Sequence, residues 1–261
     1  MRLIYRIAAV VALAAGSLVP TLAIARAQDP PADEAVLANA PLKGQTIELS
    51  DGYDYFTSAP DCNVWRGTGS SETIWVGKRY QCGFVNANGT AARFNGPTGL
   101  CPAPNLGFYV ADTNNHVIRK VDSGRDVVTI IGTPGVAGTM TDTVNPSASM
   151  KFRFPQGVAG SGIKNFYIAD TENHCIWFVN RNNGNTYLVA GEPGIPGFVN
   201  GSGRTARLNQ PRQLQIDPNN PNILYFEDYG NSGTTRFIAI TASGPGVTGC
   251  VWTPGQSNPC F

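Results

Sequence analysis

Two histidines and three aspartates are the residues of this chain whose types and spacing could support chemistry. His116 and His174 are the only histidines among the 261 residues. Asp112, Asp170 and Asp228 follow one another at intervals of 58 residues, from 112 to 170 and from 170 to 228. Imidazole is the commonest metal ligand in proteins, and carboxylates are the ligands that calcium prefers. A metal site is therefore the first hypothesis that these side chains raise.

The same five residues belong to a repeated motif, which favours a structural role instead. Residues 108–116 read Phe-Tyr-Val-Ala-Asp-Thr-Asn-Asn-His, residues 166–174 read Phe-Tyr-Ile-Ala-Asp-Thr-Glu-Asn-His, and residues 224–231 form a worn third copy. A side chain that returns in each repeat is explained more simply by a repeated hydrogen bond than by one metal. Because Asx side chains accept backbone N–H groups in turns, we predict that all five are structural turn residues. We predict no catalytic site, metal or cofactor.

Each copy of the motif is part of a longer unit with four strand-like runs. An apolar, β-branched and aromatic run precedes the Asp-Thr turn and a second run follows it, which is typical of a β-hairpin. Two glycines with five residues between them, then a proline before an apolar run, recur in each unit. In the first full copy we expect strands at roughly 97–101, 107–111, 116–122 and 126–132. A four-stranded antiparallel sheet that repeats along a chain is a β-propeller blade.

The order Gly-x5-Gly, Ala-x-Phe-x-x-Pro and Tyr-Val-Ala-Asp-Thr-x-Asn-His-x-Ile resembles the NHL-repeat family of β-propellers, over residues 73–240. The third copy departs from this order at Glu227 and Ser232, and does not by itself predict its second hairpin strand. A remnant of an earlier copy covers residues 53–66, and residues 247–255 echo residues 128–135.

This resemblance implies an all-β fold of about three and a half to four four-stranded blades. NHL domains resemble the six-bladed type, so the chain looks too short to close such a ring. We expect an open arc, a small ring, half of an assembly or a truncated gene product. In an open arc, strand edges and inner-face side chains such as Phe154, Leu214 and Ile216 would be exposed, and self-association would follow.

The first 41 residues predict a targeting segment and a leader. Arg2 and Arg6 flank the start of an apolar run, and Ala25-Arg26-Ala27 has the small-residue spacing of a cleavage site. We predict a signal peptide at 1–27, a polar, Pro-rich leader at 28–41 and the repeat domain at 42–261. The alternative is an uncleaved anchor, because the run is nearly long enough to span a bilayer. Cleavage would leave a protein that is extracellular, or periplasmic in a bacterium, and free of the membrane.

Six cysteines fit that oxidising location. Cys250 and Cys260 lie close together in a Pro/Gly-rich tail, so we predict a disulfide that staples this segment. A further bridge is expected among Cys62, Cys82 and Cys101. Cys175 is either bridged or a small buried apolar side chain.

Two sequons, at Asn88 and Asn200, are candidate glycosylation sites. They lie in the matching loops 83–93 and 197–207, and we take the two positions as equivalent. Asn-Gly turn chemistry is the alternative explanation, and both can hold together.

The balanced charge and the lack of known catalytic motifs reduce the number of functions that the sequence supports. The chain has 19 Lys and Arg and 18 Asp and Glu, so it lacks the excess of positive charge that nucleic-acid binding requires. Neither a Ser-His-Asp arrangement, a nucleophile elbow nor a phosphate loop is present. We predict a secreted, non-catalytic module that binds a protein, peptide or glycan. The alternatives are a metal-assisted lyase or hydrolase of the six-bladed type, and a truncated paralogue without independent function.

Overall fold

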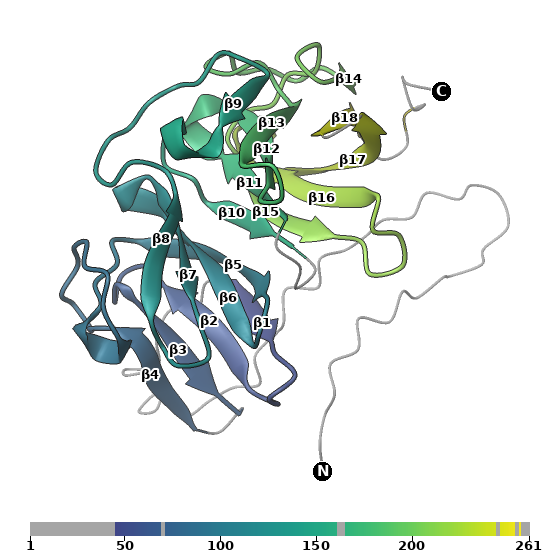
Figure 1. Cartoon of the computed structure of the whole chain (residues 1–261). Helices are drawn as coiled ribbons and strands as arrows, with labels where there is room; N and C mark the ends of the chain where they lie inside the picture. Colours follow the sequence, from purple (N-terminus) through teal and green to yellow (C-terminus); the bar gives the residue numbers. More distant parts are fainter. Residues whose placement is uncertain (1–44, 69–70, 161–164, 244–245, 254–255, 257–261) are drawn as a thin grey trace, which may run out of the picture. The chain divides into compact units, whose positions relative to one another are not determined.

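Four antiparallel β-sheets follow one another along the chain (Figure 1). The structure is a computed structural model that describes residues 45–68, 71–160, 165–243, 246–253 and 256. The predicted signal peptide and leader, at 1–41, lie outside these ranges. Within them, the only helices are single 3-10 turns. None of these described helices has the length and apolar character needed to cross a membrane. The all-β prediction is confirmed.

Sheets 1 and 2 have four strands each, hydrogen-bonded in sequence order. Sheet 1 consists of β1 (Thr46–Glu48), β2 (Asp54–Ser58), β3 (Asn63–Gly67) and β4 (Glu72–Gly77). Sheet 2 consists of β5 (Pro97–Ala103), β6 (Gly107–Asp112), β7 (Val117–Val121) and β8 (Val127–Ile131). The strands of sheet 2 agree within two residues with the ranges expected from the sequence.

Sheets 3 and 4 carry a fifth strand, which the sequence did not indicate. Sheet 3 consists of β10 (Gly157–Ala159), β11 (Phe166–Asp170), β12 (Cys175–Asn180) and β13 (Asn185–Ala190), with β9 (Val144–Pro146) beside β13. Sheet 4 consists of β15 (Pro211–Ile216), β16 (Ile223–Asp228), β17 (Thr234–Ser243) and β18 (Gly246–Trp252), with β14 (Gly201–Ser202) beside β18. Both extra strands come from the segments that join consecutive sheets.

The weak copies of the repeat form complete sheets. The remnant at 53–66 supplies β2 and β3 of sheet 1. The worn third copy does have a second hairpin strand, β17, which pairs with β16 from Asp228 to Ile223. Residues 246–252 form β18, which lies between β17 and the edge strand β14 of the same sheet. Four sheets therefore agree with the predicted three and a half to four blades.

A hairpin turn of one backbone type joins the second and third strand of every sheet. The turns cover residues 59–62, 113–116, 171–174 and 229–232, and each ends in the left-handed region, with φ of 58° at Cys62, 59° at His116, 57° at His174 and 62° at Ser232. A glycine closes the fourth strand beside the turn of each of the first three sheets. A Cβ on Gly132 would lie 2.6 Å from the carbonyl oxygen of His116, so only glycine fits there.

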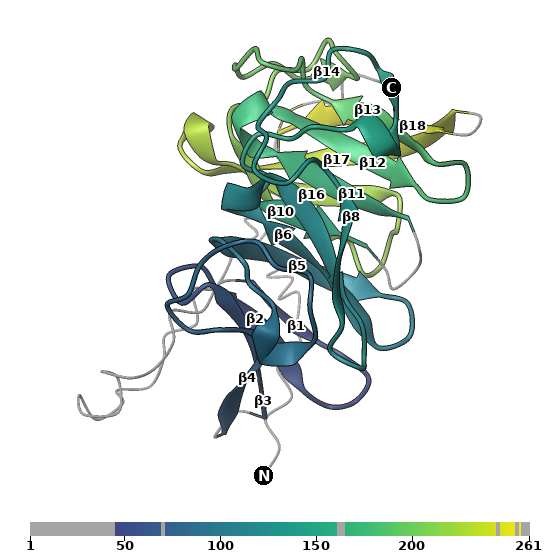
Figure 2. The same ribbon diagram turned by 60° about the vertical axis from the view of Figure 1, so that its left-hand side comes forward.

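Three buried clusters lie between consecutive sheets, and they are built from alternate residues of each strand. Tyr55 and Phe108 belong to the cluster between sheets 1 and 2, and Trp177 to the one between sheets 2 and 3. Figure 2 shows the successive sheets from a second direction. Leu214 is buried between sheets 3 and 4, and Ile216 packs against that cluster. The exposure expected of these two side chains in an open arc does not occur, because their strand turns this face toward sheet 3.

Candidate functional site: the hairpin turns

The candidate residues all lie in or beside the hairpin turns, at one end of the sheets. Asp112, Asp170 and Asp228 are the last residues of β6, β11 and β16. Each precedes a single 3-10 turn, and the histidines His116 and His174 end the turns of sheets 2 and 3. We call the segments 78–96, 133–156 and 192–210, which run between consecutive sheets, connectors 1–2, 2–3 and 3–4.

Asp112 is fully buried, and both of its carboxylate oxygens accept hydrogen bonds. Its Oδ1 accepts the backbone N–H of Asn95 at 2.7 Å, and its Oδ2 accepts Asn115 Nδ2 at 2.9 Å and Arg119 Nη1 at 2.7 Å. Burial raises the pKa of this carboxyl, while the hydrogen bonds from Asn95 and Asn115 and the guanidinium of Arg119 oppose that rise. The carboxylate ties connector 1–2 to the hairpin of sheet 2.

Arg119 was not identified as a site residue from the sequence. Its side chain is fully buried, and its guanidinium also donates to the carbonyl oxygens of Arg93 and Val85 and to Asn86 Oδ1. The same set returns in sheet 4, where Arg236 contacts Asp228 Oδ2 at 2.8 Å and three oxygens of connector 3–4, those of Arg207, Val199 and Asn200. The matching sequences of loops 83–93 and 197–207 could have indicated these arginines, because both loops supply oxygens that bind the two guanidinium groups.

In sheet 3 a tryptophan takes the place of the arginine. Trp177 Nε1 donates to Asp170 Oδ2 at 3.3 Å, while Asn173 Nδ2 and the backbone N–H of Arg153 supply the other two bonds, at 2.8 and 2.7 Å. Burial raises the pKa of Asp170 to about 7, and its three N–H donors oppose that rise. The direct guanidinium partner of Asp112 has no counterpart here, which leaves Asp170 the easier carboxylate to protonate.

The histidines and the threonines of the turns bind the segments that lead into the next sheet along the chain. His116 Nδ1 accepts the backbone N–H of Phe154 at 3.2 Å, and Thr113 Oγ1 donates to the carbonyl oxygen of Pro155 at 2.8 Å. His174 and Thr171 repeat both bonds on Gln210 and Pro211, at 3.1 and 2.9 Å. Burial lowers the pKa of both His116 and His174. The neutral imidazole is the form that can accept these bonds.

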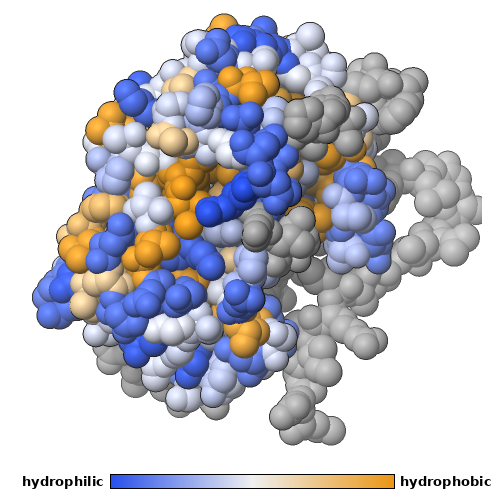
Figure 3. All heavy atoms as spheres, in the orientation of Figure 1, coloured by the Kyte–Doolittle hydropathy of each residue, from blue (hydrophilic) through white to orange (hydrophobic). Residues whose placement is uncertain are grey.

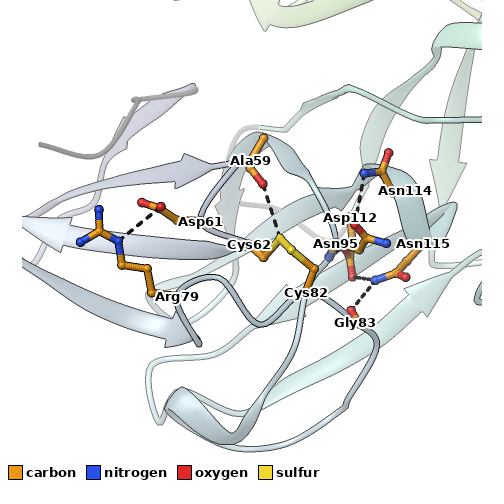
Figure 4. The surroundings of a disulfide bond; sticks show 10 residues. All are labelled: Ala59, Asp61, Cys62, Arg79, Cys82, Gly83, Asn95, Asp112, Asn114 and Asn115. Atoms are coloured by element: carbon orange, nitrogen blue, oxygen red, sulfur yellow. Dashed lines mark hydrogen bonds and ion pairs between the residues drawn. A yellow bond between two sulfur atoms is a disulfide. The ribbon is translucent and has the colours of Figure 1, made fainter. Parts of the chain in front are cut away.

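The same turn position carries a different residue in the first and last sheets. In sheet 1 it is Cys62, which forms a disulfide with Cys82 of connector 1–2 and confirms a bridge among the first three cysteines. Figure 4 shows this bridge beside Gly83, whose carbonyl oxygen accepts Asn115 Nδ2 at 2.8 Å. In sheet 4, Tyr229 and Ser232 replace the threonine and the histidine. The links between consecutive sheets are thus covalent at the first turn and hydrogen-bonded at the next two.

The candidate aspartates and histidines are all used in hydrogen bonds of the turns. Within the described ranges, no group of three or more His, Cys, Asp or Glu side chains is placed to hold a metal ion. The three turn carboxylates are fully buried, and each accepts a backbone N–H and an Asn side chain. The histidine Nδ1 atoms accept backbone N–H groups. These groups are committed to holding the turns rather than free to bind a substrate.

Most of the exposed apolar side chains gather at this same end. Among the described residues, nine of the twelve large hydrophobic side chains with high exposure lie in the hairpin turns or in the connectors outside β9 and β14: Tyr80, Phe84, Val85, Val136, Phe154, Ile195, Phe198, Val199 and Tyr229. The connector tips are fixed to the turns, because Gly135 and Gly194 donate backbone N–H groups to Asn115 and Asn173. Figure 3 shows hydrophobic side chains reaching the surface between polar ones. We call these nine residues the turn-end surface.

The remaining cysteines and the sequons have mixed outcomes. Cys101 and Cys175 are buried free thiols. Cys260 lies outside the described residues, so its disulfide with Cys250 stays a prediction. Asn88 and Asn200 are not at equivalent positions, contrary to our expectation, because the residue that binds Arg119 as Asn200 binds Arg236 is Asn86. Glycosylation of either asparagine stays a prediction.

The sequence comparisons agree with this geometry. The model of the NHL repeat family matches residues 94–121, which run from the end of connector 1–2 through β7. The chain contains an NHL repeat. The other three sheets have the same turn backbone as this matched region.

Two curated proteins are similar to part of this chain. "Protein SUPPRESSOR OF QUENCHING 1, chloroplastic" from Arabidopsis thaliana is 28% identical over 149 residues, which cover 56% of this chain and 14% of that protein. "NHL repeat-containing protein 2" from Homo sapiens is 26% identical over 165 residues, which cover 56% of this chain and 23% of that protein. The chain spans less than a quarter of the length of either relative.

Solved structures share the fold at low sequence identity. A gluconolactonase from Xanthomonas campestris has a TM-score of 0.55 at 8% identity and covers 80% of this chain and 61% of its own. A virginiamycin B lyase from Staphylococcus aureus has a TM-score of 0.51 at 13% identity, with coverages of 84% and 58%. An auxiliary nutrient binding protein from Bacteroides thetaiotaomicron has a TM-score of 0.50 at 17% identity, with coverages of 78% and 46%. Because both enzymes and a binding protein share it, the fold does not determine the activity.

Proposed function

We propose that this protein is a secreted, non-catalytic binding module whose turn-end surface contacts a protein or peptide. The observation that carries the proposal is the division of labour at this end of the sheets. The Asp and His side chains that could do chemistry are buried and hold the turns, while apolar and aromatic side chains are exposed around them. Clustered exposed apolar groups that are held on a rigid scaffold favour binding over catalysis.

The position of Tyr80 supports a binding role for this surface. Tyr80 has a φ of 59° and is 69% exposed, and its backbone N–H binds the carbonyl oxygen of Asp61 as those of Gly135 and Gly194 bind later turns. A side chain at a position where two other connectors use glycine costs conformational energy. The ring therefore stands in solvent at a strained position, beside Arg79, whose guanidinium lies 4.8 Å from its centroid. Aromatic and arginine side chains of this kind are enriched at binding hot spots.

A peptide-display selection tests the proposal with variants that leave the buried turns intact. Peptides selected on the wild-type chain should bind at least about tenfold more weakly to a Val136→Glu, Ile195→Glu double variant, since each carries a charge into an apolar contact. Val128→Glu is the matched control, because Val128 is equally exposed, at 45%, but lies on β8. Peptides that bind all three chains alike, or a tightly held stoichiometric calcium or zinc ion with turnover of an ester or lactone, would overturn the proposal.

Secretion is a separate part of the proposal and has its own test. It rests on the signal-like order of residues 1–27 and on the disulfide between Cys62 and Cys82. Expression of the full chain should give a mature N-terminus at Gln28 outside the cytoplasm. An intact N-terminus in the cytoplasmic fraction, with Cys62 and Cys82 reduced, would contradict it.

A further inference from the structure

The three connectors carry an excess of positive charge that the chain as a whole does not show. They contain seven Lys and Arg residues and two Asp and Glu residues, a net charge of +5, whereas the whole chain has a net charge of +1. The same connectors supply eight of the nine residues of the turn-end surface. Positive charge and exposed apolar side chains are therefore concentrated in the same segments.

Two of these cations each lie beside an exposed valine. Val85 and Arg93 form an antiparallel β-bridge with N···O distances of 3.4 and 3.2 Å. Val199 and Arg207 form the same bridge, at 3.2 and 3.0 Å. Side chains of residues paired in this way point to the same face, with Cβ atoms roughly 4.5–5.5 Å apart. The valines are 43% and 48% exposed, so each pair presents an apolar side chain next to a cation. We call Val85–Arg93 and Val199–Arg207 the valine–arginine pairs.

A buried guanidinium holds the backbone of each valine–arginine pair. Arg119 donates to both carbonyl oxygens of the first pair, at 2.9 and 3.1 Å, and Arg236 donates to both carbonyl oxygens of the second pair, at 2.8 Å each. These two buried arginines also bind the turn aspartates of sheets 2 and 4. The valine–arginine pairs are therefore fixed relative to the hairpin turns, at the end of the sheets where the turn-end surface lies.

The guanidinium groups of Arg93 and Arg207 are oriented by their own loops and not by carboxylates. The Nη1 atom of each donates to the carbonyl oxygens one and three residues earlier in the chain. Within the described ranges neither guanidinium forms an ion pair, and Glu192, in the same connector as Arg207, is already paired with Arg204. The loop carbonyls therefore hold each positive charge in place without neutralising it.

Connector 2–3 places a lysine at the equivalent position. The backbone N–H of Gly138 binds the carbonyl oxygen of Phe152, and the corresponding glycines of the other two connectors bind the residue after the arginine in the same way. Lys151, which precedes Phe152, is exposed and has no ion-pair partner among the residues that the structure describes. Three consecutive connectors therefore present one uncompensated cation each at the same place.

We propose that the partner of the turn-end surface is an acidic peptide segment that carries both carboxylates and apolar side chains. This inference rests on the binding function proposed above and names the chemistry of its ligand. The carboxylates would pair with Arg93, Lys151 and Arg207, and the apolar side chains would contact Val85 and Val199. A guanidinium that is already oriented loses less conformational freedom when it binds a carboxylate. A peptide fits better than a uniformly charged polymer, because an apolar side chain lies beside each arginine.

Peptide display on the wild-type chain at low ionic strength tests this inference. The selected peptides should be enriched in Asp and Glu. They should bind an Arg93→Glu, Arg207→Glu double variant at least about tenfold more weakly, because two attractive charges become repulsive. Val85→Ser with Val199→Ser should weaken the same peptides at least about threefold through lost apolar contact. Arg181→Glu is the matched control, since Arg181 is exposed in the loop between β12 and β13 at the other end of sheet 3, and it should leave the dissociation constant unchanged.

A measurement on the wild type alone guards against variants that fail to fold. Raising the sodium chloride concentration from about 0.05 M to about 0.5 M should weaken the selected peptides at least about fivefold, because salt screens charge pairs at a surface. Peptides that lose affinity for the Val136→Glu, Ile195→Glu variant, yet are not acidic or do not respond to salt, overturn this inference and leave the proposed binding function intact. Peptides that bind that variant as well as the wild type overturn both.

A heparin oligosaccharide distinguishes a peptide from a uniformly charged polymer. It should bind the wild type more weakly than the selected peptides do, because it has no apolar side chains for the two valines. Tighter binding of the oligosaccharide, unchanged by Val85→Ser with Val199→Ser, would assign the cations to a polyanion and overturn the proposal.

Discussion

The hairpin turns of sheets 2 and 3 bury the same aspartate in two different ways. Asp112 has a guanidinium at 2.7 Å, from Arg119, while Asp170 has an indole N–H at 3.3 Å, from Trp177. The asparagine and backbone bonds to the two carboxylates are otherwise the same. Sheet 2 neutralises a buried charge with a buried charge, whereas sheet 3 has no direct cation and uses the additional space for core packing. The same turn backbone can therefore hold a buried aspartate that is paired with a cation or one that is bound only by neutral N–H donors.

The connectors differ in step with the partner of the aspartate. Connectors 1–2 and 3–4 contain Gly-Phe-Val-Asn, and the phenylalanine rings lie 4.6 and 4.7 Å from the guanidinium groups of Arg119 and Arg236. Connector 2–3 has Gly138-Thr139-Met140 at this place, and Met140 packs on the cluster that holds Trp177. A connector that contacts a buried arginine supplies carbonyl oxygens and an aromatic ring, while the connector that contacts the tryptophan supplies an apolar side chain. The sequence of each connector therefore matches the type of strand residue, Arg or Trp, that it contacts.

The strongest test of this comparison is Arg119→Met. It removes the cation and leaves Asp112 buried, so we expect a loss of about 3–5 kcal/mol in the free energy of unfolding. Chemical denaturation measures this loss. Lys120→Met on the same strand is the matched control and should change stability by less than about 0.5 kcal/mol, because Lys120 is partly exposed and forms no ion pair with any residue that the structure describes. Equal effects of the two variants would show that the buried pair contributes nothing particular.

The pH dependence of stability should expose the other side of the comparison. The pKa of Asp170 is raised by burial from about 3.9 in the unfolded chain to about 7 in the folded one. The stability contribution of this group is then fully present below pH 4 and is lost as the pH rises toward 7. The slope approaches about 1.4 kcal/mol per pH unit, so the loss between pH 5 and pH 6.5 is about 2 kcal/mol.

Carboxyl NMR of Asp170 reports this titration directly, alongside denaturation at each pH. Asp217 is an opposite control, because its hydrogen bond from Tyr225 lowers its pKa, and stability from that group is lost on acidification instead. An Asp170 resonance that titrates near pH 4 would show that the indole and amide donors alone stabilise the ionised form, and would remove this distinction between sheets 2 and 3.

Much of the fold followed from the sequence because the repeat is local. The period of the aspartates, the alternating apolar runs and the glycine at the close of each unit predicted four strands, and the strands of sheet 2 match closely. The worn copies also fold as complete sheets, because burial of residues such as Phe226 and Val64 decides the structure when the turn residues change. The fifth strands were not predictable, since β14 has two residues and no apolar pattern.

The partners of the site residues were harder to predict than the residues themselves. The aspartates and histidines were found by their period, but Asp112 binds Asn95, 17 residues away, and His116 binds Phe154, 38 residues away. Such contacts depend on how consecutive sheets pack, which a strand pattern does not specify. Arg119 and Arg236 could have been predicted from the sequence. The two loops that bind them, 83–93 and 197–207, have matching sequences, and both of the sheets that follow these loops carry an arginine.

Trp177→Phe should have a moderate effect. It removes the N–H donor from Asp170 and leaves a small cavity in the cluster between sheets 2 and 3, so we expect a loss of about 1.5 kcal/mol at pH 8. The effect should shrink at pH 5, where Asp170 is protonated and needs the donor less. Thermal unfolding at the two pH values measures both quantities. A loss that is the same at pH 5 and pH 8 would assign the whole effect to the cavity and none to the hydrogen bond.

The smallest expected effect tests whether connector and strand residue act as one unit. Phe84→Leu keeps an apolar side chain in connector 1–2 but removes the ring that lies 4.6 Å from Arg119, so we expect a loss of about 0.5–1 kcal/mol. In the Arg119→Met background the same change should cost clearly less, because no cation remains for the ring to stabilise. A double-mutant cycle of the four chains isolates this coupling. Additive losses would mean that Phe84 only covers apolar surface, and the match between Gly-Phe-Val-Asn connectors and arginines would then need another cause.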